Sequence, residues 1–132
     1  MTTSIARRLA LTVAAAGALT VGFAAPAIAA PSAPVTHCEN TTNLQGGGTV
    51  TPCLSFQGGQ VRAYAVFSSA PANCTFSLQL WHNHSQFSPS TPCSDVASLV
   101  LTAATAANDS YLTGVLVQPG NVQAYTSYYD AP

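Results

Sequence analysis

The chain has 132 residues, of which 48% are hydrophobic and only 5% are charged, with three basic and four acidic residues. This length suits a single domain. The composition disfavours a nucleic-acid partner, because a protein that binds phosphates must neutralise several of them with lysine or arginine. An anionic membrane surface makes the same demand.

Residues 1–30 carry the pattern of a secretory signal peptide. Arg7 and Arg8 precede an apolar run over residues 9–23, and Ala27-Ile28-Ala29 supplies the small residues that a signal peptidase recognises. A permanent membrane anchor, the alternative, needs roughly 18 to 20 strongly apolar residues, whereas this run is short and rich in alanine, as in bacterial signals. We therefore expect cleavage of this segment, secretion, and no membrane association afterwards.

We expect residues 31–36, a proline-containing stretch, to form a flexible lead into one domain over residues 37–132. Without the signal peptide, this domain keeps Arg62 as its one basic residue and has no lysine. One positive and four negative charges give it a net charge of −3. The acidic residues are Glu39, Asp95, Asp109 and Asp130.

Four cysteines, an even number in a small exported chain, predict two disulfides. Of the three possible pairings we favour Cys38 with Cys53 and Cys74 with Cys93, because each bridge then closes a loop of about 15 to 20 residues. In the chain-entropy model each bridge stabilises the fold by about 3 kcal/mol. The alternative, a structural zinc site, needs cysteines two to four residues apart, and this chain has no such pair.

Glycine clusters at residues 46–48 and 58–59 predict turns, and an alternating segment follows each of them. Residues 60–67 place apolar side chains on one face and Arg62 and Tyr64 on the other. This alternation is typical of a half-buried strand.

Residues 74–81 alternate most regularly and predict a central strand that faces a core. Residues 97–105 form an apolar run that predicts a more buried strand, with a helix as the alternative because of Ala103 and Ala104. The C-terminal pattern comprises a strand over residues 111–117, a turn over residues 118–121 and a less regular segment over residues 122–129.

About six short strands separated by turns predict an all-β fold. We expect a small antiparallel β-sandwich, or a partly open barrel, stapled by two disulfides. The longest irregular stretch is the loop over residues 82–95, which Cys93 ties near its end. Loops of this kind often carry function.

His82 and His84 form an H-x-H pattern, whose imidazoles would share one face of a strand and could bind copper or zinc. Two ligands do not complete a metal site, and two solvated loop histidines are the alternative. The chain contains no G-x-S-x-G nucleophile elbow and has few titratable groups. We therefore expect no enzyme activity, no catalytic residue and no cofactor.

Trp81 and Tyr64 lie on the polar faces of their predicted strands, and further tyrosines cluster near the end of the chain. Outward aromatic rings can stack on sugar rings while neighbouring amides bond the hydroxyl groups. The alternative for a single tryptophan is packing in the core or at a sheet edge. The clustered tyrosines are Tyr125, Tyr128 and Tyr129.

These patterns predict a secreted, non-catalytic protein, a glycan-binding or cell-envelope-associated module in which Trp81 and Tyr64 stack on the glycan. A second hypothesis is an inhibitor of a secreted protease or glycosidase, which presents residues 82–92 as a rigid wedge because a tethered loop loses less entropy on docking. Metal binding through His82 and His84 is a third hypothesis. The expected partner is therefore an extracellular glycan or protein.

Overall fold

The computed structural model describes residues 33–132, so the signal peptide expected over residues 1–30 lies outside the described part. No helix within that part has the length and hydrophobicity needed to cross a membrane. The elements in chain order are β1 (Val35–Cys38), β2 (Thr42–Asn43), β3 (Thr49–Gln57), β4 (Gln60–Ser68), β5 (Thr75–Trp81), β6 (Ser85–Phe87), β7 (Thr91–Pro92), the 3₁₀ helix η2 (Cys93–Ser98), β8 (Leu101–Ala104), β9 (Ser110–Gln118), β10 (Val122–Tyr125) and β11 (Tyr129–Asp130).

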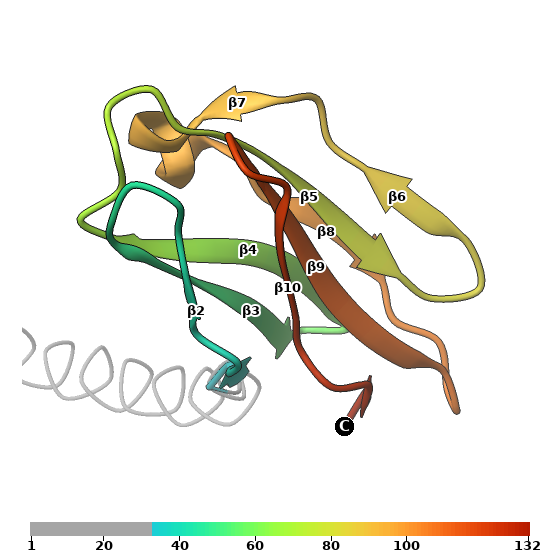
Figure 1. Ribbon diagram of the computed structural model, residues 1–132. Helices are drawn as coiled ribbons and strands as arrows, with labels where there is room; N and C mark the ends of the chain where they lie inside the picture. Colours follow the sequence, from blue (N-terminus) through green and yellow to red (C-terminus); the bar gives the residue numbers. More distant parts are fainter. Residues whose placement is uncertain (1–32) are drawn as a thin grey trace, which may run out of the picture. The chain divides into compact units, whose positions relative to one another are not determined.

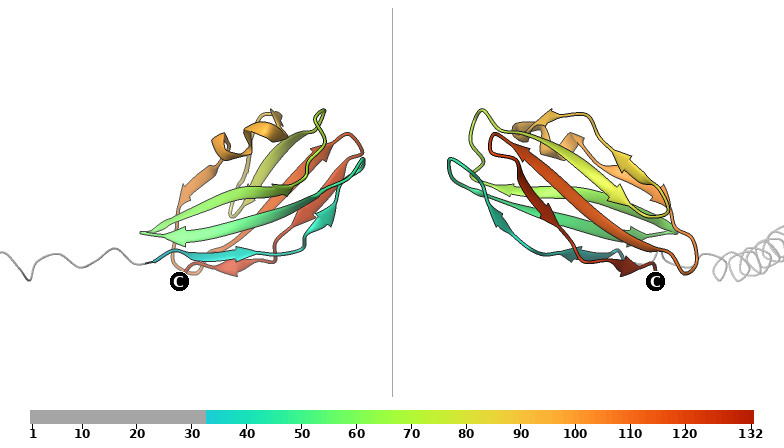
Figure 2. Two further views of the ribbon diagram at one scale, coloured as in Figure 1. Left: turned by 90° about the vertical axis from the view of Figure 1, so that its left-hand side faces the viewer. Right: turned by 45° about the vertical axis from the view of Figure 1, so that its right-hand side comes forward.

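The strands form two antiparallel sheets, which confirms the predicted all-β sandwich (Figures 1 and 2). The first sheet has the order β1-β3-β4-β8, with β2 also pairing with β3. The second sheet has the order β10-β9-β5-β6, with β11 also pairing with β9 and β7 with β5. Each sheet therefore has an inner face that covers the core and an outer face that is open to solvent.

Alternation along the strands decides which side chains face the core. In β4, Val61 and Ala63 are buried while Arg62 between them is exposed. In β5, Phe76 and Leu78 are buried at alternate positions, and β5 lies between β9 and β6. The predicted strands over residues 60–67 and 74–81 are therefore confirmed, together with their inward and outward faces.

The space between the sheets is filled by two clusters of buried apolar side chains. One cluster contains Phe76, whose ring meets Phe67 edge to face at a centroid distance of 5.0 Å. The other contains Tyr111, whose ring meets Phe56 at 5.8 Å. Because both pairs join one sheet to the other, they fix how the two layers stack.

Both predicted disulfides are confirmed, Cys38–Cys53 and Cys74–Cys93. The first joins directly opposed residues of β1 and β3. The second ties the start of η2 to the residue that precedes β5, and both of its cysteines are buried in the core. One bridge thus secures the N-terminal strand and the other secures the connection between the sheets.

The segment from His82 to Asp95 is not the irregular loop that the sequence predicts. Instead β6 and β7 pair with β5 and form an edge of the second sheet. Between them, Ser88 keeps the chain on β5, since its N–H donates to the carbonyl of Leu78 at 2.9 Å and its hydroxyl accepts the Leu78 N–H at 2.8 Å. These bonds hold the chain beside β5 at the break between β6 and β7, where Pro89 has no N–H to donate.

The predicted buried strand over residues 97–105 is wrong in both extent and burial. Its first residues belong to η2, where the Ser98 hydroxyl donates to the carbonyl of Asp95 at 2.7 Å. Only Leu101–Ala104 forms a strand, and it pairs with β4 alone at the edge of the first sheet. An edge strand with one open face alternates between half-buried and exposed residues, so its apolar composition does not make it a core strand.

The first and last strands of the domain lie together. Val35 and Thr36, which the sequence assigns to the lead, already belong to β1. The ring of His37 in β1 stacks on Tyr129 in β11, with centroids 3.7 Å apart and planes inclined by 9°. The neighbouring carboxylate of Glu39 accepts the Tyr129 hydroxyl at 2.9 Å.

The Glu39 carboxylate also accepts the backbone N–H of Ser127. This hydrogen bond, followed by that from Tyr129, lowers the pKa of Glu39 below its ordinary value of 4.5. The same carboxylate raises the pKa of the Tyr129 hydroxyl, because the hydrogen bond to Glu39 favours the protonated phenol. We call these residues, with His37, the terminal clasp.

Candidate functional site

The outer face of the second sheet carries a row of four residues in register across four strands. Phe87 of β6 lies opposite Gln79 of β5, which lies opposite Gly114 of β9, which lies opposite Tyr125 of β10. Neighbouring strands are about 4.8 Å apart, so the two aromatic residues at the ends of the row stand about 14 Å apart at their backbones. We call this surface, together with Trp81, the aromatic face.

Gly114 allows the ring of Tyr125 to lie flat on the sheet. A β-carbon at position 114 would stand only 2.7 Å from Cε1 and 2.9 Å from Cδ1 of that ring. The Tyr125 hydroxyl donates to Oε1 of Gln123 at 3.1 Å, which fixes the ring from its polar end. A glycine inside a strand therefore serves here as a seat for an aromatic side chain.

A hollow of about 120 Å³ lies between Phe87 and Tyr125. Residues of β5, β6, β9 and β10 line it, among them Gln79 and Gln123. Phe87 is 68% exposed and Tyr125 is 40% exposed, although both are large apolar groups that soluble proteins usually cover. The hollow thus combines exposed rings with amide groups that can donate and accept hydrogen bonds.

Trp81 extends the aromatic face along β5, two residues beyond Gln79, and is 37% exposed. Because Gln79 pairs with Phe87, Trp81 is a diagonal neighbour of Phe87, which places their β-carbons within about 8 Å. Leu112 and Leu116 of β9 are half-buried and belong to the same outer face, where Leu112 lies opposite Trp81. The three rings therefore surround a shallow apolar strip.

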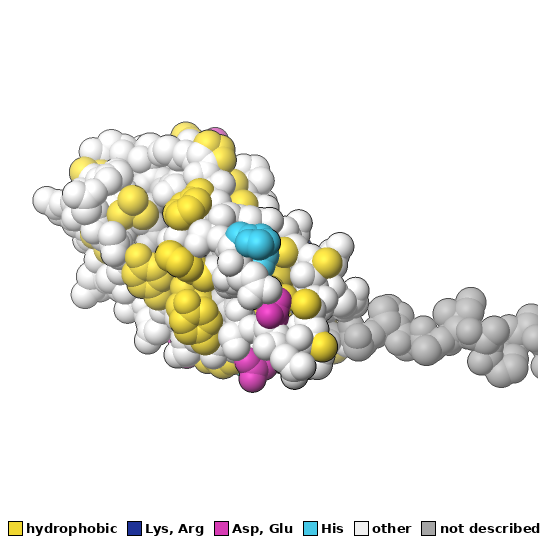
Figure 3. Space-filling model, turned by 90° about the vertical axis from the view of Figure 1, so that its right-hand side faces the viewer, with side chains coloured by type: hydrophobic (Ala, Val, Ile, Leu, Met, Phe, Trp, Pro, Cys, Tyr) yellow, Lys and Arg dark blue, Asp and Glu magenta, His cyan; other side chains and the backbone are white. Residues whose placement is uncertain are grey.

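None of the outward-facing residues of β5, β6, β9 and β10 is charged, and the one acidic strand residue of this face, Asp130 of β11, lies opposite Ser110. The residues that point outward from β5, β6, β9 and β10 are serine, threonine, glutamine, leucine, glycine and the three aromatic residues. Figure 3 shows hydrophobic side chains gathered on this side of the molecule with no basic side chain among them. A ligand that covers the face would not be obliged to pair with a buried charge.

The two aromatic residues that the sequence singles out do not act together. Trp81 lies on the outer face of the second sheet, whereas Tyr64 of β4 lies on the outer face of the first sheet. The two side chains therefore point away from each other across the sandwich. In the sequence, Tyr125 is only one of several clustered tyrosines, and no predicted site includes Phe87 or Gly114.

Two signals in the sequence point to the missed residues. Gly114 stands inside an otherwise apolar, β-branched strand, which is the usual mark of a close approach by another group. The three residues between Trp81 and Ser85 have the length of a hairpin loop, and Phe87 then falls on the same face as Trp81. The second signal is not visible if residues 82–95 are taken as one irregular loop.

His82 and His84 lie in the turn between β5 and β6 rather than on one strand. Their rings are 5.6 Å apart and inclined by 62°, and the ring of His82 lies 5.7 Å from that of Tyr111. Nε2 of His82 is buried and forms no hydrogen bond within residues 33–132. In the same range no three His, Cys, Asp or Glu side chains come together as a possible metal site.

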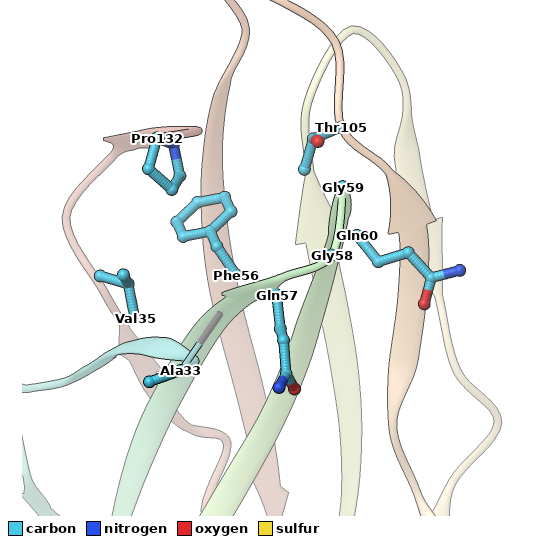
Figure 4. Close-up of a pocket in the computed structure, with 9 residues that line it drawn as sticks. All are labelled: Ala33, Val35, Phe56, Gln57, Gly58, Gly59, Gln60, Thr105 and Pro132. Atoms are coloured by element: carbon cyan, nitrogen blue, oxygen red, sulfur yellow. The ribbon is translucent and has the colours of Figure 1, made fainter. Parts of the chain in front are cut away.

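The sandwich has a further hollow of about 310 Å³ at one end. Figure 4 shows Val35, Phe56 and Pro132 on one side of it and the turn at Gly58 and Gly59 on the other. Its lining contains no titratable side chain. Its polar lining residues are Gln57, Gln60 and Thr105, and none of these side chains is charged.

Comparisons with protein-family models, with curated proteins and with solved structures found no match to the chain.

Proposed function

We propose that the protein is an extracellular, non-catalytic module that binds neutral polysaccharides on its aromatic face. The observation that carries this proposal is the row in which Phe87 and Tyr125 flank Gln79 and Gly114. An exposed ring that lies flat on a sheet exposes its π-face to solvent. The apolar C–H face of a sugar ring is a partner of matching shape and polarity.

In this arrangement each aromatic side chain has a separate role. Tyr125 is held flat over Gly114 and provides the floor on which one sugar ring stacks. Phe87 and Trp81 provide further apolar contacts along the strip. The amides of Gln79 and Gln123 bond sugar hydroxyls, which both donate and accept hydrogen bonds. An extended polysaccharide chain can span the whole row.

The charge distribution favours a neutral glycan over an acidic one. An acidic polymer needs lysine or arginine at the binding surface. In residues 33–132 the one such side chain is Arg62, which lies on the other sheet. A neutral chain requires no counter-charge and leaves no ionised group unpaired when the strip is covered.

Two intramolecular disulfides are typical of extracellular proteins and support the expected export. The Cys74–Cys93 bridge also secures the sheet that carries the aromatic face, because it joins η2 to the residue that precedes β5. A rigid sheet can keep its rings in place without a bound ligand. Such preorganisation reduces the entropy lost on binding.

The test is adsorption of the purified protein, with both disulfides formed, to insoluble cellulose, chitin and cell-wall glycan. We expect retention by at least one neutral glycan and none by an insoluble acidic polysaccharide. Tyr125→Ala and Phe87→Ala should each weaken adsorption at least about fivefold, as truncation of a central aromatic contact does. Tyr128→Ala is the matched control, since Tyr128 is 60% exposed but lies outside the aromatic face.

Equal retention of all these variants would contradict the proposal, and so would retention by the acidic polysaccharide alone. If no glycan retains the protein, the inhibitor hypothesis becomes the next one to test. In that case the segment over residues 82–92 would dock as the edge of a sheet, because β6 and β7 hold it against β5.

A further inference from the structure

A third hollow, of about 320 Å³, lies on the outer face of the first sheet, on the opposite side of the sandwich from the aromatic face. We propose that it binds a small ligand that carries a carboxylate on an apolar body. The residues that the argument uses are Thr36, Ser55, Arg62, Tyr64, Val96 and Val100. This site goes beyond the proposed glycan function and uses none of its residues.

Arg62 supplies the charge complementarity. It is the one lysine or arginine within residues 33–132, and it forms no ion pair with the acidic residues of that range. A guanidinium presents parallel N–H donors that match the two oxygens of a carboxylate. In a domain that carries four acidic side chains, the one cation therefore stands free within a hollow.

The neighbouring strands place hydroxyl groups beside the guanidinium. Ser55 of β3 lies directly opposite Arg62 of β4, and Thr36 of β1 lies directly opposite Ser55. The hydroxyls of Thr36 and Ser55 are 3.1 Å apart and share one hydrogen bond. One of the two hydroxyl protons donates within this pair, so the other is available to a ligand oxygen.

Tyr64 adds a third hydroxyl. It follows Arg62 on the same face of β4, and within residues 33–132 its oxygen has one polar contact, with Sγ of Cys38 at 4.0 Å, which is weak. The Tyr64 hydroxyl is therefore also able to donate to a carboxylate.

The wall opposite these polar groups is apolar. Val96 belongs to η2, and Val100 lies between η2 and β8, so this wall is set by the segment that Cys93 anchors. A hollow of this size lies at the lower end of the range for small-molecule sites. The wall can cover a short aliphatic or aromatic body while the carboxylate faces Arg62, and this selects an amphipathic monocarboxylate over a free inorganic anion.

The test is titration of the ¹⁵N-labelled protein with three small probes, followed by amide chemical shifts. Hexanoate has both parts of the proposed ligand, hexanamide lacks the charge, and acetate lacks the apolar body. We expect hexanoate to shift the amide signals of Ser55, Arg62 and Tyr64. Hexanamide and acetate should each bind at least about tenfold more weakly, because each loses one of the two contacts.

Arg62→Gln should reduce hexanoate binding to the level of hexanamide, whereas Arg62→Lys should retain part of it. Gln60→Ala is the matched control, because Gln60 is also exposed on β4 but does not line this hollow. Equal binding of hexanoate and hexanamide would overturn the proposal. So would an Arg62→Gln variant that folds, as judged by its amide spectrum, and binds hexanoate as the unaltered protein does.

Discussion

The ring of Tyr125 lies against Gly114 so closely that position 114 has no room for a β-carbon, which would stand 2.7 Å from Cε1 of the ring. We therefore predict that Gly114→Ala displaces the ring and lowers the free energy of unfolding by about 1–3 kcal/mol, as overpacking does. Adsorption to the glycan that retains the unaltered protein should fall as well. Urea denaturation and the adsorption assay measure the two effects.

A double-mutant cycle separates this close approach from a general intolerance of alanine at position 114. In a Tyr125→Ala background the ring is absent, so Gly114→Ala should cost little. An equal loss of stability in both backgrounds would show that the ring is not the cause.

The terminal clasp predicts a specific dependence of stability on pH. The pKa of Glu39 is lower in the folded protein than its ordinary value of 4.5, because Ser127 and Tyr129 donate hydrogen bonds to the carboxylate. The stability that these hydrogen bonds contribute is therefore present above pH 4.5, and it is lost as the pH falls through the lowered pKa of Glu39. Glu39→Gln should be less stable than the unaltered protein at neutral pH, and the difference should vanish in acid. Unfolding curves recorded over a pH series would contradict this role of Glu39 if the difference in stability between the two proteins stayed constant.

Tyr129 makes the stability of the terminal clasp depend on pH in the alkaline range. The hydrogen bond to Glu39 raises the pKa of Tyr129 above 10.0. The contribution of this bond to folding stability is therefore complete below pH 10.0 and is lost as the pH rises through the raised pKa. Tyr129→Phe should remove this alkaline loss while keeping a ring to stack on His37. Spectrophotometric titration of the phenol measures the shift directly, and an unshifted Tyr129 would contradict the prediction.

Nε2 of His82 is buried without a hydrogen-bond partner in the described range, which is a cost to the folded state. We predict that His82→Phe raises the free energy of unfolding by about 1 kcal/mol, because it replaces the unpaired nitrogen with carbon and keeps a ring beside Tyr111. His84→Phe is the control, since His84 is exposed and should gain nothing. A loss of stability in His82→Phe would mean that the nitrogen has a partner after all.

The two disulfides should differ in their contribution to stability. Each closes a loop of similar length, with separations of 15 and 19 residues, so chain entropy assigns about 3 kcal/mol to either bridge. The bridge between Cys74 and Cys93 is also part of the core, whereas Cys38 is exposed. Replacing Cys74 and Cys93 with alanine should therefore lower the urea midpoint more than replacing Cys38 and Cys53. The reverse order would contradict the role of burial.

The sequence predicts the strands whose burial alternates along their length, because one face of each covers the core. This holds for β4 and β5, and the loop lengths between cysteines led to the observed pairing. The edges of the sheets were not predictable in the same way. An apolar run such as residues 99–101 has the composition of a core strand, but only Leu101 of these residues belongs to β8, which has one neighbouring strand.

The candidate site was predicted only in part for a related reason. The polar-face position of Trp81 is visible in the alternation of β5, but which residues lie beside it depends on strand order. Tyr64 and Trp81 have equivalent patterns, yet their strands belong to different sheets. Phe87 reaches the aromatic face only because β6 folds back on β5, and no periodicity marks a strand of three residues.

The terminal clasp also determines how the domain can be attached to something else. Because His37 near the start of the described domain stacks on Tyr129 near its end, residues 33 and 132 lie at neighbouring positions. A linker, a fusion partner or an anchoring segment joined to either terminus would therefore hold the domain in a similar orientation. Joining the two ends and opening the chain at the glycine turn near residue 47 should likewise leave the sheets intact, so the domain is a natural candidate for circular permutation.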